Sequence, residues 1–555
     1  MPLAIINASV LTMDPENPCA EAVFSRDGRI VAVGSTADIL ALAGEGATVV
    51  DAAGATVTPG LWESHMHLFS GAAELDHLQL AEILGIEALT AAARTYANTK
   101  PDEILLFAQG ASYSLLGEDV RMTRHHLDQV LPDRAFAIFA YDHHTVWANT
   151  RALELGGLLH GAEIGAGAEI VMGEDGMATG ELREMEAFSP LLSVTGFERY
   201  RLGLSTGGEP DPYPVGEEFE KDVAVMRRGL EYCVSHGFTS LLLMDGNLHQ
   251  LQVLDEIRRR DGFLPARVRV PFHYKNFMTL DALEKASMMA ATYKDDELSS
   301  GTVKLFYDGV LENWTARMVE PYGNNPDTTG DSLFTPEEFA KVAVEADRRG
   351  LQIAVHSIGD GAVRAVLDGY AAAQQKNGAR DSRHRVEHIE VVHPDDIPRF
   401  KALGAIASMQ PPHPPGAMGL PLEPTLSAIG RERWPYAYAW RTLKDAGAHI
   451  PFASDWPVSP ICPIRGMKAA VTRRTWADDL PDQSFTLQEA IAAYTVEGAY
   501  AEFKEDRKGR IKPGFHADLT IFSDNLEAID PEKLDTASVK WTITGGRVVF
   551  AAVPN

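Results

Sequence analysis

The sequence predicts an α/β fold: a (β/α)8 TIM barrel with a small β-sandwich built from both ends of the chain and an α/β insertion after the first barrel strand. Three observations lead to this prediction. Apolar β-like runs alternate with amphipathic helical stretches through the middle of the chain, which is typical of a parallel sheet with crossover helices. Both chain ends contain short β-like runs with little helix between them, and about 170 residues lie between His67 and Thr239.

The two ends of the chain are predicted to form one β module. Residues 1–57 contain three β-like runs, one of which turns at an Asp-Gly pair, and residues 506–555 repeat this style with a Gly-Gly turn. We therefore expect these two segments to be the N-terminal and C-terminal parts of a β-sandwich. The main body of the chain, residues 58–505, would be inserted between them.

Eight apolar runs in the main body are predicted as barrel strands. They lie at 56–67, 239–246, 266–274, 302–309, 351–360, 384–390, 404–411 and 449–457. Helical stretches such as 336–350 and 361–378 lie between consecutive strands, and eight such units fit a (β/α)8 barrel. A doubly wound open sheet is the competing architecture, but no Gly-x-Gly-x-x-Gly sequence follows the first strand.

The segment after the first strand is far longer than one crossover connection requires. It contains β-like runs of its own, "EILLFAQG" and "RAFAIFAYDHH", together with helical pieces. Residues from about 72 to 220 are therefore predicted to form an inserted subdomain over the barrel mouth.

The composition argues against several classes of partner. The chain has 50 Lys and Arg residues against 78 Asp and Glu, for a net charge of −28. Such an acidic chain is poorly suited to the phosphates of nucleic acids or to an anionic membrane surface. No apolar run approaches the ~18 residues that span a bilayer. Three scattered cysteines imply no disulfide framework, so we expect a cytoplasmic protein.

Five of the predicted strands carry potential metal-binding side chains at or near their carboxyl ends. These residues are His65, His67, Lys304, His356, His388 and Asp455. The carboxyl ends of barrel strands converge on one face, where such enzymes keep their sites. Each residue alone is more typical of a structural role, but four clustered imidazoles without a metal would leave ring nitrogens without partners. The joint pattern therefore indicates a metal site.

Longer stretches of sequence surround these residues. They include "PGLWESHMHL", "VKLFYDGVLENWTA", "IAVHSIGDGAVRAVLDGY" and "FASDWPVSPICPIRGMKAAVTR", and with others they run through essentially the whole chain. The chain thereby resembles the amidohydrolase superfamily of metal-dependent hydrolases, and within it the branch that contains N-substituted formamide deformylases. This resemblance implies the barrel, the split β-sandwich and the insertion after the first strand.

The resemblance also implies a binuclear metal centre. His65, His67 and Asp455 would bind the first metal ion, and the histidines of the fifth and sixth strands would bind the second. Lys304 would bridge both ions as its N-carboxylated form, because a free ammonium beside two dications would be repelled. A mononuclear site with a bystander lysine is the alternative. Imidazole and carboxylate ligands favour zinc, although iron, manganese or cobalt also suit such a site.

The activity that follows is hydrolysis of a C–N bond in an amide, such as an N-formyl or N-acyl amine, by a metal-bridging hydroxide. Asp455 would take the proton of this nucleophile and deliver it to the leaving amine. A cyclic amidase or lactonase with the same site is one alternative. A mononuclear deaminase is another, but "HSIGDGAV" lacks the Glu expected after His356. A non-catalytic barrel scaffold is least favoured because all six ligand positions are filled.

Four further residues are predicted to contact a small-molecule substrate: His144, Asp308, Arg317 and Trp456. A structural role is an equal alternative for the histidine, which lies in the insertion, and packing is the favoured role of the tryptophan. Other histidines near strand ends, His413 among them, are interpreted as structural or surface residues. The oligomeric state stays open, with a homodimer as one option.

Overall fold

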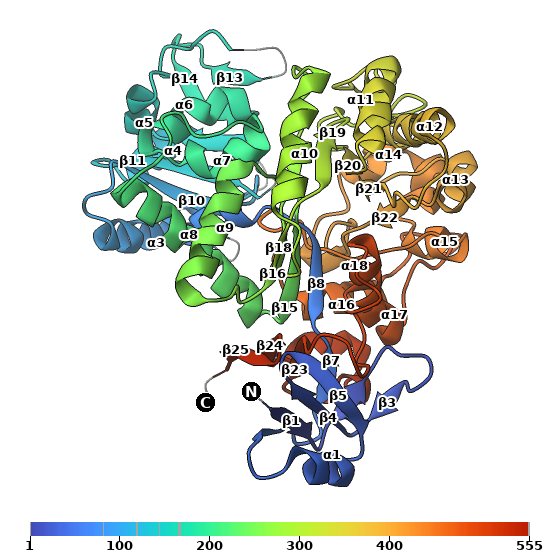
Figure 1. The fold of residues 1–555 in the computed structure, drawn as a ribbon. Helices are drawn as coiled ribbons and strands as arrows, with labels where there is room; N and C mark the ends of the chain where they lie inside the picture. The colour runs from blue at the N-terminus through green and yellow to red at the C-terminus, as the bar shows by residue number, and fades with distance from the viewer. Residues whose placement is uncertain are drawn as a thin grey trace. The chain divides into compact units, whose positions relative to one another are not determined.

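The computed structural model describes residues 2–80, 83–117, 120–141, 143, 145–164 and 168–552. The chain folds into two compact units (Figure 1). Unit 1 consists of Met1–His67, Leu230–Trp456 and Pro460–Asn555, and unit 2 consists of Leu68–Gly229 and Pro457–Ser459. Both units combine helices with β-sheets, which confirms the predicted α/β class.

The main body of unit 1 contains two parallel sheets. The first has the strand order β18-β16-β15-β8, from β8 (Leu61–Met66), β15 (Phe238–Leu243), β16 (Arg267–Arg269) and β18 (Leu298–Ser299). The second has the order β17-β19-β20-β21-β22, from β17 (Phe272–His273), β19 (Thr302–Phe306), β20 (Gln352–Ser357), β21 (Arg385–His388) and β22 (Ile406–Ser408). The longer strands are buried on both faces, as their near-continuous apolar runs require.

These sheets differ from the predicted barrel, because the described strands do not form one continuous closed sheet. β16 and β17 belong to one predicted strand, but Pro271 lies between them and has no N–H to donate. The predicted eighth strand makes only isolated bridges to the β22 region, and it contains Pro451. The Asp455 N–H nevertheless donates to the His65 carbonyl at 3.0 Å. The last segment therefore connects the second sheet to β8 without being a regular strand.

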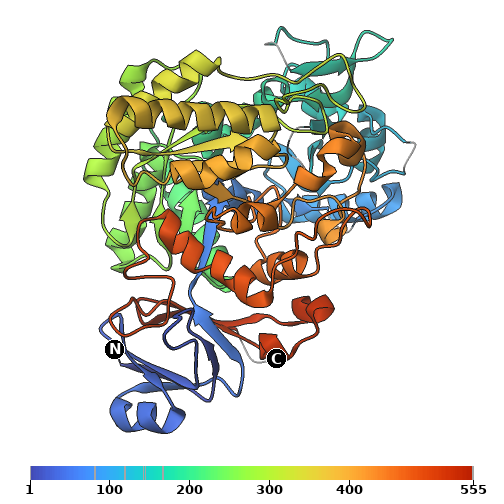
Figure 2. The ribbon, with the colours of Figure 1, turned by 90° about the vertical axis from the view of Figure 1, so that its right-hand side faces the viewer.

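Helices cover the parallel sheets on their outer side. Examples are α9 (Leu248–Asp261), α10 (Leu283–Thr292), α11 (Pro336–Arg348), α12 (Asp360–Asn377) and α13 (Ile397–Leu403). α11 begins with a capping box, in which Thr335 and Glu338 bond to each other's backbone N–H. α11 and α12 lie side by side (Figures 1 and 2). A Cβ at Gly369 would come within 2.4 Å of the Phe339 ring, so the glycine allows this close packing.

The chain ends form two further sheets in unit 1. A four-stranded sheet has the order β5-β4-β1-β6, from β1 (Leu3–Ile6), β4 (Ala22–Arg26), β5 (Arg29–Gly34) and β6 (Thr48–Asp51). A six-stranded sheet has the order β25-β24-β23-β7-β2-β3, from β2 (Ser9–Leu11), β3 (Cys19–Ala20), β7 (Thr56–Pro59), β23 (Leu519–Phe522), β24 (Val539–Thr544) and β25 (Arg547–Ala551). Antiparallel pairing of β7 with β23 brings both chain ends into one sheet. Ile5, Val23 and Ile521 belong to an apolar core that contains residues of both sheets.

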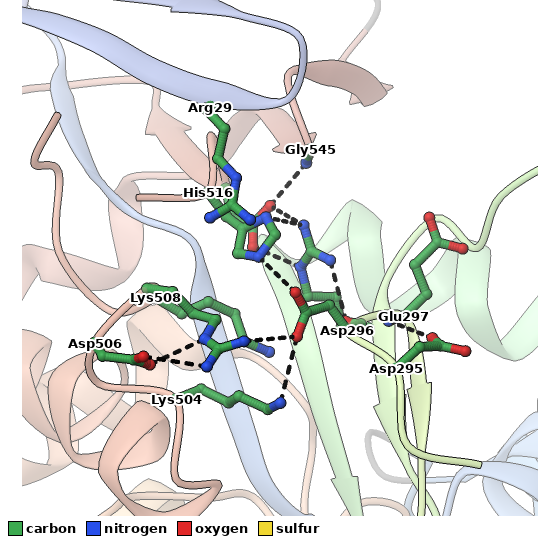
Figure 3. A network of polar contacts seen from close by, with 12 residues as sticks. Arg29, Asp295, Asp296, Glu297, Lys504, Asp506, Lys508, His516 and Gly545 are labelled. Atoms are coloured by element: carbon green, nitrogen blue, oxygen red, sulfur yellow. Dashed lines mark hydrogen bonds and ion pairs between the residues drawn. The ribbon is translucent and has the colours of Figure 1, made fainter. Parts of the chain in front are cut away.

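A cluster of charged groups, the Arg267 network, connects β16 to the C-terminal segment (Figure 3). The Arg267 guanidinium is buried and bonds to both carboxylate oxygens of Asp518, at 2.7 and 3.0 Å. It also donates to His516 Nδ1 at 3.2 Å, and His516 Nε2 lies 3.1 Å from Asp296 Oδ2. Lys504 donates to the other oxygen of Asp296 at 3.3 Å. These five residues therefore form a set of paired charges, and Arg507 Nη1 also lies 3.6 Å from Asp296 Oδ1.

Unit 2 is built on a six-stranded mixed sheet of order β13-β14-β12-β11-β10-β9. Its strands are β9 (Leu78–Gln79), β10 (Leu105–Ala111), β11 (Ala135–Ala140), β12 (Thr145–Ala148), β13 (Glu169–Met172) and β14 (Ala178–Arg183). Alternate residues of β10 enter different cores: Phe107 packs in one and Leu106 in the other. No helix of the described residues is long and apolar enough to cross a membrane.

Candidate metal centre

His65 and His67 lie at the carboxyl end of β8, on the same face of the strand. Both side chains are buried. His65 Nε2 lies 3.3 Å and His67 Nε2 lies 3.2 Å from Asp455 Oδ1. One ligand atom of each of the three residues lies within 4.8 Å of the others. The structure thus brings Asp455 next to two histidines that precede it by 388 and 390 positions in the sequence. The ligand atoms of the three side chains face one another.

The orientation of each imidazole is fixed by a carboxylate behind it. His65 Nδ1 lies 2.7 Å from Glu387 Oε2, and His67 Nδ1 lies 3.1 Å from Asp245 Oδ1. A carboxylate at Nδ1 keeps the ring proton there and leaves the Nε2 lone pair for a metal. Arg385 donates to both oxygens of Glu387, at 2.6 and 3.0 Å, and so fixes that carboxylate in turn.

The donor set of the three residues fits a divalent metal ion. Asp455 Oδ1 is buried, and among the described residues it has no hydrogen-bond partner unless His67 Nε2, 3.2 Å away, carries a proton. Burial disfavours a charged His67, but the Asp245 and Asp455 carboxylates outweigh burial and raise the pKa of His67 to about 9. A positive charge is therefore favoured between His67 and Asp455. A proton meets this need in the metal-free chain, and a metal ion bound by two imidazoles and a carboxylate would meet it better.

The other three predicted ligands lie in the same cluster. Lys304 on β19 is fully buried, and its Nζ lies 3.4 Å from His65 Nε2. Burial lowers the pKa of this lysine from 10.5 to about 8, so the neutral amine is far more populated near neutral pH than in an exposed lysine. The ring centroid of His388, at the end of β21, lies 4.7 Å from that of His65 and 4.6 Å from that of His356 on β20.

Two of the clustered residues have an unusual backbone conformation. His388 has a φ of 75° and Asp455 has a φ of 61°. Residues other than glycine rarely adopt such left-handed angles, and those that do are concentrated at functional sites. Ile389, a β-branched residue next to His388, also has a positive φ of 51°. The surrounding structure therefore holds the ends of β21 and of the Asp455 segment in place at a cost in free energy.

His413, which the sequence led us to expect as a structural or surface residue, belongs to a second group. Ligand atoms of His388, His413 and Asp455 lie within 4.8 Å of one another. The His413 ring is stacked parallel to that of His388, with 6.0 Å between centroids. Its Nε2 is buried and has no hydrogen-bond partner among the described residues. The signal was available, because His413 lies two residues after the predicted strand 404–411 and so, like the other histidines, near a strand end.

Glu63 lies behind the candidate metal centre and connects two of its segments. It is completely buried on β8. Its Oε1 accepts hydrogen bonds from the Ser454 N–H at 2.8 Å and the His65 N–H at 3.4 Å. Glu63 therefore ties together the two chain segments that carry His65 and Asp455.

The Asp308 carboxylate is surrounded by backbone N–H groups and does not face an open pocket. It is buried, and its two oxygens accept hydrogen bonds from the backbone N–H groups of Arg317, Ile358 and Gly359, at 2.9 to 3.0 Å. Burial outweighs these bonds and raises the pKa of Asp308 to about 8. These contacts fix the loop after β19 against the end of β20.

The remaining predicted substrate residues differ in their surroundings. The Arg317 side chain donates to Thr329 Oγ1 at 2.5 Å and to a neighbouring carbonyl. Trp456 is buried, with its ring centroid 5.3 Å from that of Tyr232. His144 lies outside the described residues. These contacts assign loop-fixing and packing roles, and the substrate contacts stay predictions.

Comparisons with known proteins agree with this geometry. Residues 48–550 match the model of the Amidohydrolase family. The chain is 26% identical to Protein LONG AFTER FAR-RED 3 of Arabidopsis thaliana, over 99% of this chain and 91% of that protein. It is also 26% identical to N-substituted formamide deformylase of Arthrobacter pascens, over 94% of this chain and 93% of that enzyme.

Among solved structures, an uncharacterized metal-dependent hydrolase from Pyrococcus furiosus is similar, with a TM-score of 0.72 and 25% identity. The match covers 96% of this chain and 100% of that one. The resemblance expected from the sequence is therefore confirmed. Because the family match spans most of the chain, this protein belongs to the amidohydrolase family.

Proposed function

We propose that this chain is a metal-dependent hydrolase that cleaves the C–N bond of an amide, with N-formyl and N-acyl amines as the first candidate substrates. The observation that carries the proposal is the convergence of His65 Nε2, His67 Nε2 and Asp455 Oδ1 in a buried place. The similarity to an enzyme named as an N-substituted formamide deformylase supports this substrate class.

In this proposal His65, His67 and Asp455 hold one metal ion. His356 and His388, near the ends of β20 and β21, would contribute to a second, and Lys304 would supply ligand oxygens as its N-carboxylated form. Imidazole and carboxylate donors favour zinc. Such ions, when bound, polarise a substrate carbonyl and lower the pKa of a water molecule. We also propose that the two parallel sheets are parts of one (β/α)8 barrel, because the Asp455 segment bonds to both of them.

The side chains have separate tasks in the reaction. Glu387 and Asp245 hold the two imidazoles of β8 in one orientation. Asp455 Oδ1 faces those imidazoles, whereas its Oδ2 lies 4.0 Å from His388 Nδ1. We assign the proton transfer to Asp455 Oδ2, which would take a proton from the attacking water and pass it to the leaving nitrogen. Burial of the cluster excludes other water from the reacting groups.

Two alternatives use related machinery. A cyclic amidase or lactonase would need the same residues in the same roles. A mononuclear deaminase would leave Lys304 without a task, although its Nζ lies inside the ligand cluster, 3.4 Å from His65 Nε2. That contact favours the binuclear hydrolase over the deaminase.

The test is a metal count by elemental mass spectrometry on protein purified without chelator, joined to a substrate screen. About two ions per chain, with formate or another acid released from N-formyl or N-acyl amines, would support the proposal. Ammonia released from an aminopurine by a protein with one ion would favour the deaminase. Opening of cyclic amides or lactones alone would favour the second alternative. No bound metal after reconstitution with zinc would refute the proposed site.

A further inference from the structure

Unit 2 contains a cavity that shares no lining residue with the candidate metal centre. Its volume is about 420 Å³, and residues 73–107 and 195–228 contribute its lining. All of these residues belong to unit 2, whereas the six clustered ligands belong to unit 1. Small-molecule sites usually have volumes of roughly 300–1,000 Å³. The cavity is therefore large enough for one aromatic ring with a short polar substituent.

One part of the cavity wall is made of aromatic rings. The ring centroid of His77 lies 5.3 Å from that of Phe107 and 4.8 Å from that of Phe197. Tyr200 packs edge-on against Phe197, with centroids 6.0 Å apart. All four rings line the cavity. Rings at such distances and tilts can accept a further aromatic ring in an offset or edge-to-face arrangement.

His77 offers a hydrogen-bond donor to this cavity. Gln109 Nε2 donates to His77 Nδ1 at 2.8 Å, so the ring proton is on Nε2. Burial lowers the pKa of His77 to about 3, with a further contribution from Lys100, and the ring is neutral at physiological pH. Among the described residues no hydrogen-bond partner of the Nε2–H is present. A ligand oxygen in the cavity would provide the missing acceptor.

The charged residues around the cavity are not all paired. Arg228 lies 2.7 Å from Asp76, and Lys221 lies 2.7 Å from a glutamate one turn earlier on α8 (Glu217–Ser235). Lys100 and Glu103 also line the cavity, but neither forms an ion pair with a described residue. The ammonium of Lys100 is therefore available to an anion, in a chain whose net charge is −28.

We propose that this cavity binds a small aromatic carboxylate. The ring would lie against the cluster of His77, Phe107 and Phe197, and the carboxylate would accept the His77 Nε2–H and pair with Lys100. Plain aromatic acids and aromatic amino acids share this chemistry. Glu103 distinguishes them, because its carboxylate can pair with the α-ammonium group of an amino acid. The proposal does not depend on the metal chemistry of unit 1.

The first experiment is isothermal titration calorimetry of the full chain with phenylacetate and with L-phenylalanine. We expect saturable binding of at least one of them, at about one per chain, with the same affinity before and after the metal is removed by a chelator. Tighter binding of L-phenylalanine that is lost in Glu103→Gln would identify amino acids as the ligands. Binding of neither probe, or binding that disappears with the metal, would overturn the proposal.

A pair of lysine variants tests where the carboxylate lies. Lys100→Met should weaken binding at least roughly tenfold, because it removes a charge-assisted contact. Lys221→Met is the matched control, since that lysine lines the same cavity but is already paired. Ala224→Trp should block binding by filling the cavity from an exposed position. Equal effects of the two lysine variants, or full binding by a folded Ala224→Trp protein, would contradict the proposed site.

Discussion

The candidate metal centre and the Arg267 network are both buried polar clusters of unit 1, and they differ in how their atoms are paired. In the Arg267 network the guanidinium, the imidazole of His516 and the carboxylates of Asp296 and Asp518 all have partners. In the candidate metal centre Asp455 Oδ1 has a hydrogen-bond partner among the described residues only when His67 Nε2 carries a proton. Buried polar atoms are normally satisfied. The polar groups of the Arg267 network thus satisfy one another, whereas the candidate metal centre needs a proton or a metal ion to do so.

The two clusters also differ in backbone strain. His388 and Asp455 of the metal centre have left-handed backbone angles. None of the five residues of the Arg267 network, all of them described, has a positive φ. Strain of this kind persists only where other contacts hold it. Of the two clusters, the strained one is the candidate metal centre, to which we assign the function.

The largest expected effect is on the rate of the proposed reaction, in the variant Asp455→Asn. This change removes the proposed proton carrier and one anionic ligand but keeps the shape of the side chain. We expect kcat to fall by about 10²–10⁴-fold, with little change in thermal stability. Steady-state kinetics on an active amide and a metal count would measure this. A rate within tenfold of wild type would remove Asp455 from the mechanism.

A substitution in the Arg267 network should lower the stability of the protein and leave the metal centre unaffected. Asp518→Asn leaves a buried guanidinium without its bidentate partner, which typically costs about 3–5 kcal/mol. We expect this loss in the free energy of unfolding from urea titrations, with unchanged metal affinity. A weakened metal affinity at full stability would show that the two clusters are not independent.

The next effect concerns the residues behind the ligands. Glu387→Gln keeps an acceptor for His65 Nδ1 but removes the charge that favours the metal-binding form. We expect metal affinity to fall by about 10–100-fold, as measured by competition with a chromophoric chelator. Asp296→Asn, in the Arg267 network, is the matched control and should leave metal affinity unchanged. Equal metal affinities of Glu387→Gln and wild type would contradict a positioning role for this carboxylate.

The clustering of the predicted ligands could be predicted from sequence, because strand ends of parallel sheets meet at one edge. Glu387 could not. Strand alternation should place Glu387 and His388 on opposite faces, yet Glu387 bonds to His65 and the His388 ring lies 4.7 Å from the same imidazole. The left-handed backbone at His388 allows both contacts. Such a backbone angle leaves no trace in residue types.

The fold was predictable at the level of its class and less so in its connections. Alternating apolar and amphipathic runs indicated an α/β fold, which the structure confirms. The regular closed barrel was not found, because Pro271 and Pro451 interrupt predicted strands and cannot donate to a ladder. The domain boundaries at 57, 72, 220 and 505 stay predictions.

A smaller effect is expected at His413. His413→Phe keeps a ring that can stack on His388 but removes the buried Nε2 that has no partner among the described residues. If this nitrogen contacts the substrate, kcat/KM should fall by roughly fivefold, the worth of one ordinary hydrogen bond. The affinity of the metal at His65 and His67 should not change. Unaltered kcat/KM would return His413 to the structural role that its sequence position first suggested.

The smallest effect is a pH dependence of stability that His516 gives to the Arg267 network. Burial, and then the charge of Arg267, lowers the pKa of this imidazole from 6.5 to about 4. Between these values the unfolded chain binds a proton that the folded chain does not, so stability is greatest above about pH 6.5 and falls as the pH falls towards 4. Asp296 does not titrate in this window, because its pKa is lowered to about 2.

His516→Gln isolates this contribution, because glutamine can donate and accept but does not titrate in this range. Urea titrations between about pH 7 and 4.5 should show a slope that is shallower than that of wild type by up to about one proton. Histidines of the metal centre also titrate, but their contribution is the same in both proteins and cancels in the difference. Identical slopes would mean that the pKa of His516 is the same in the folded and the unfolded chain. The imidazole would then take up a proton beside Arg267 at mildly acidic pH, and burial in the Arg267 network would not disfavour its charged form.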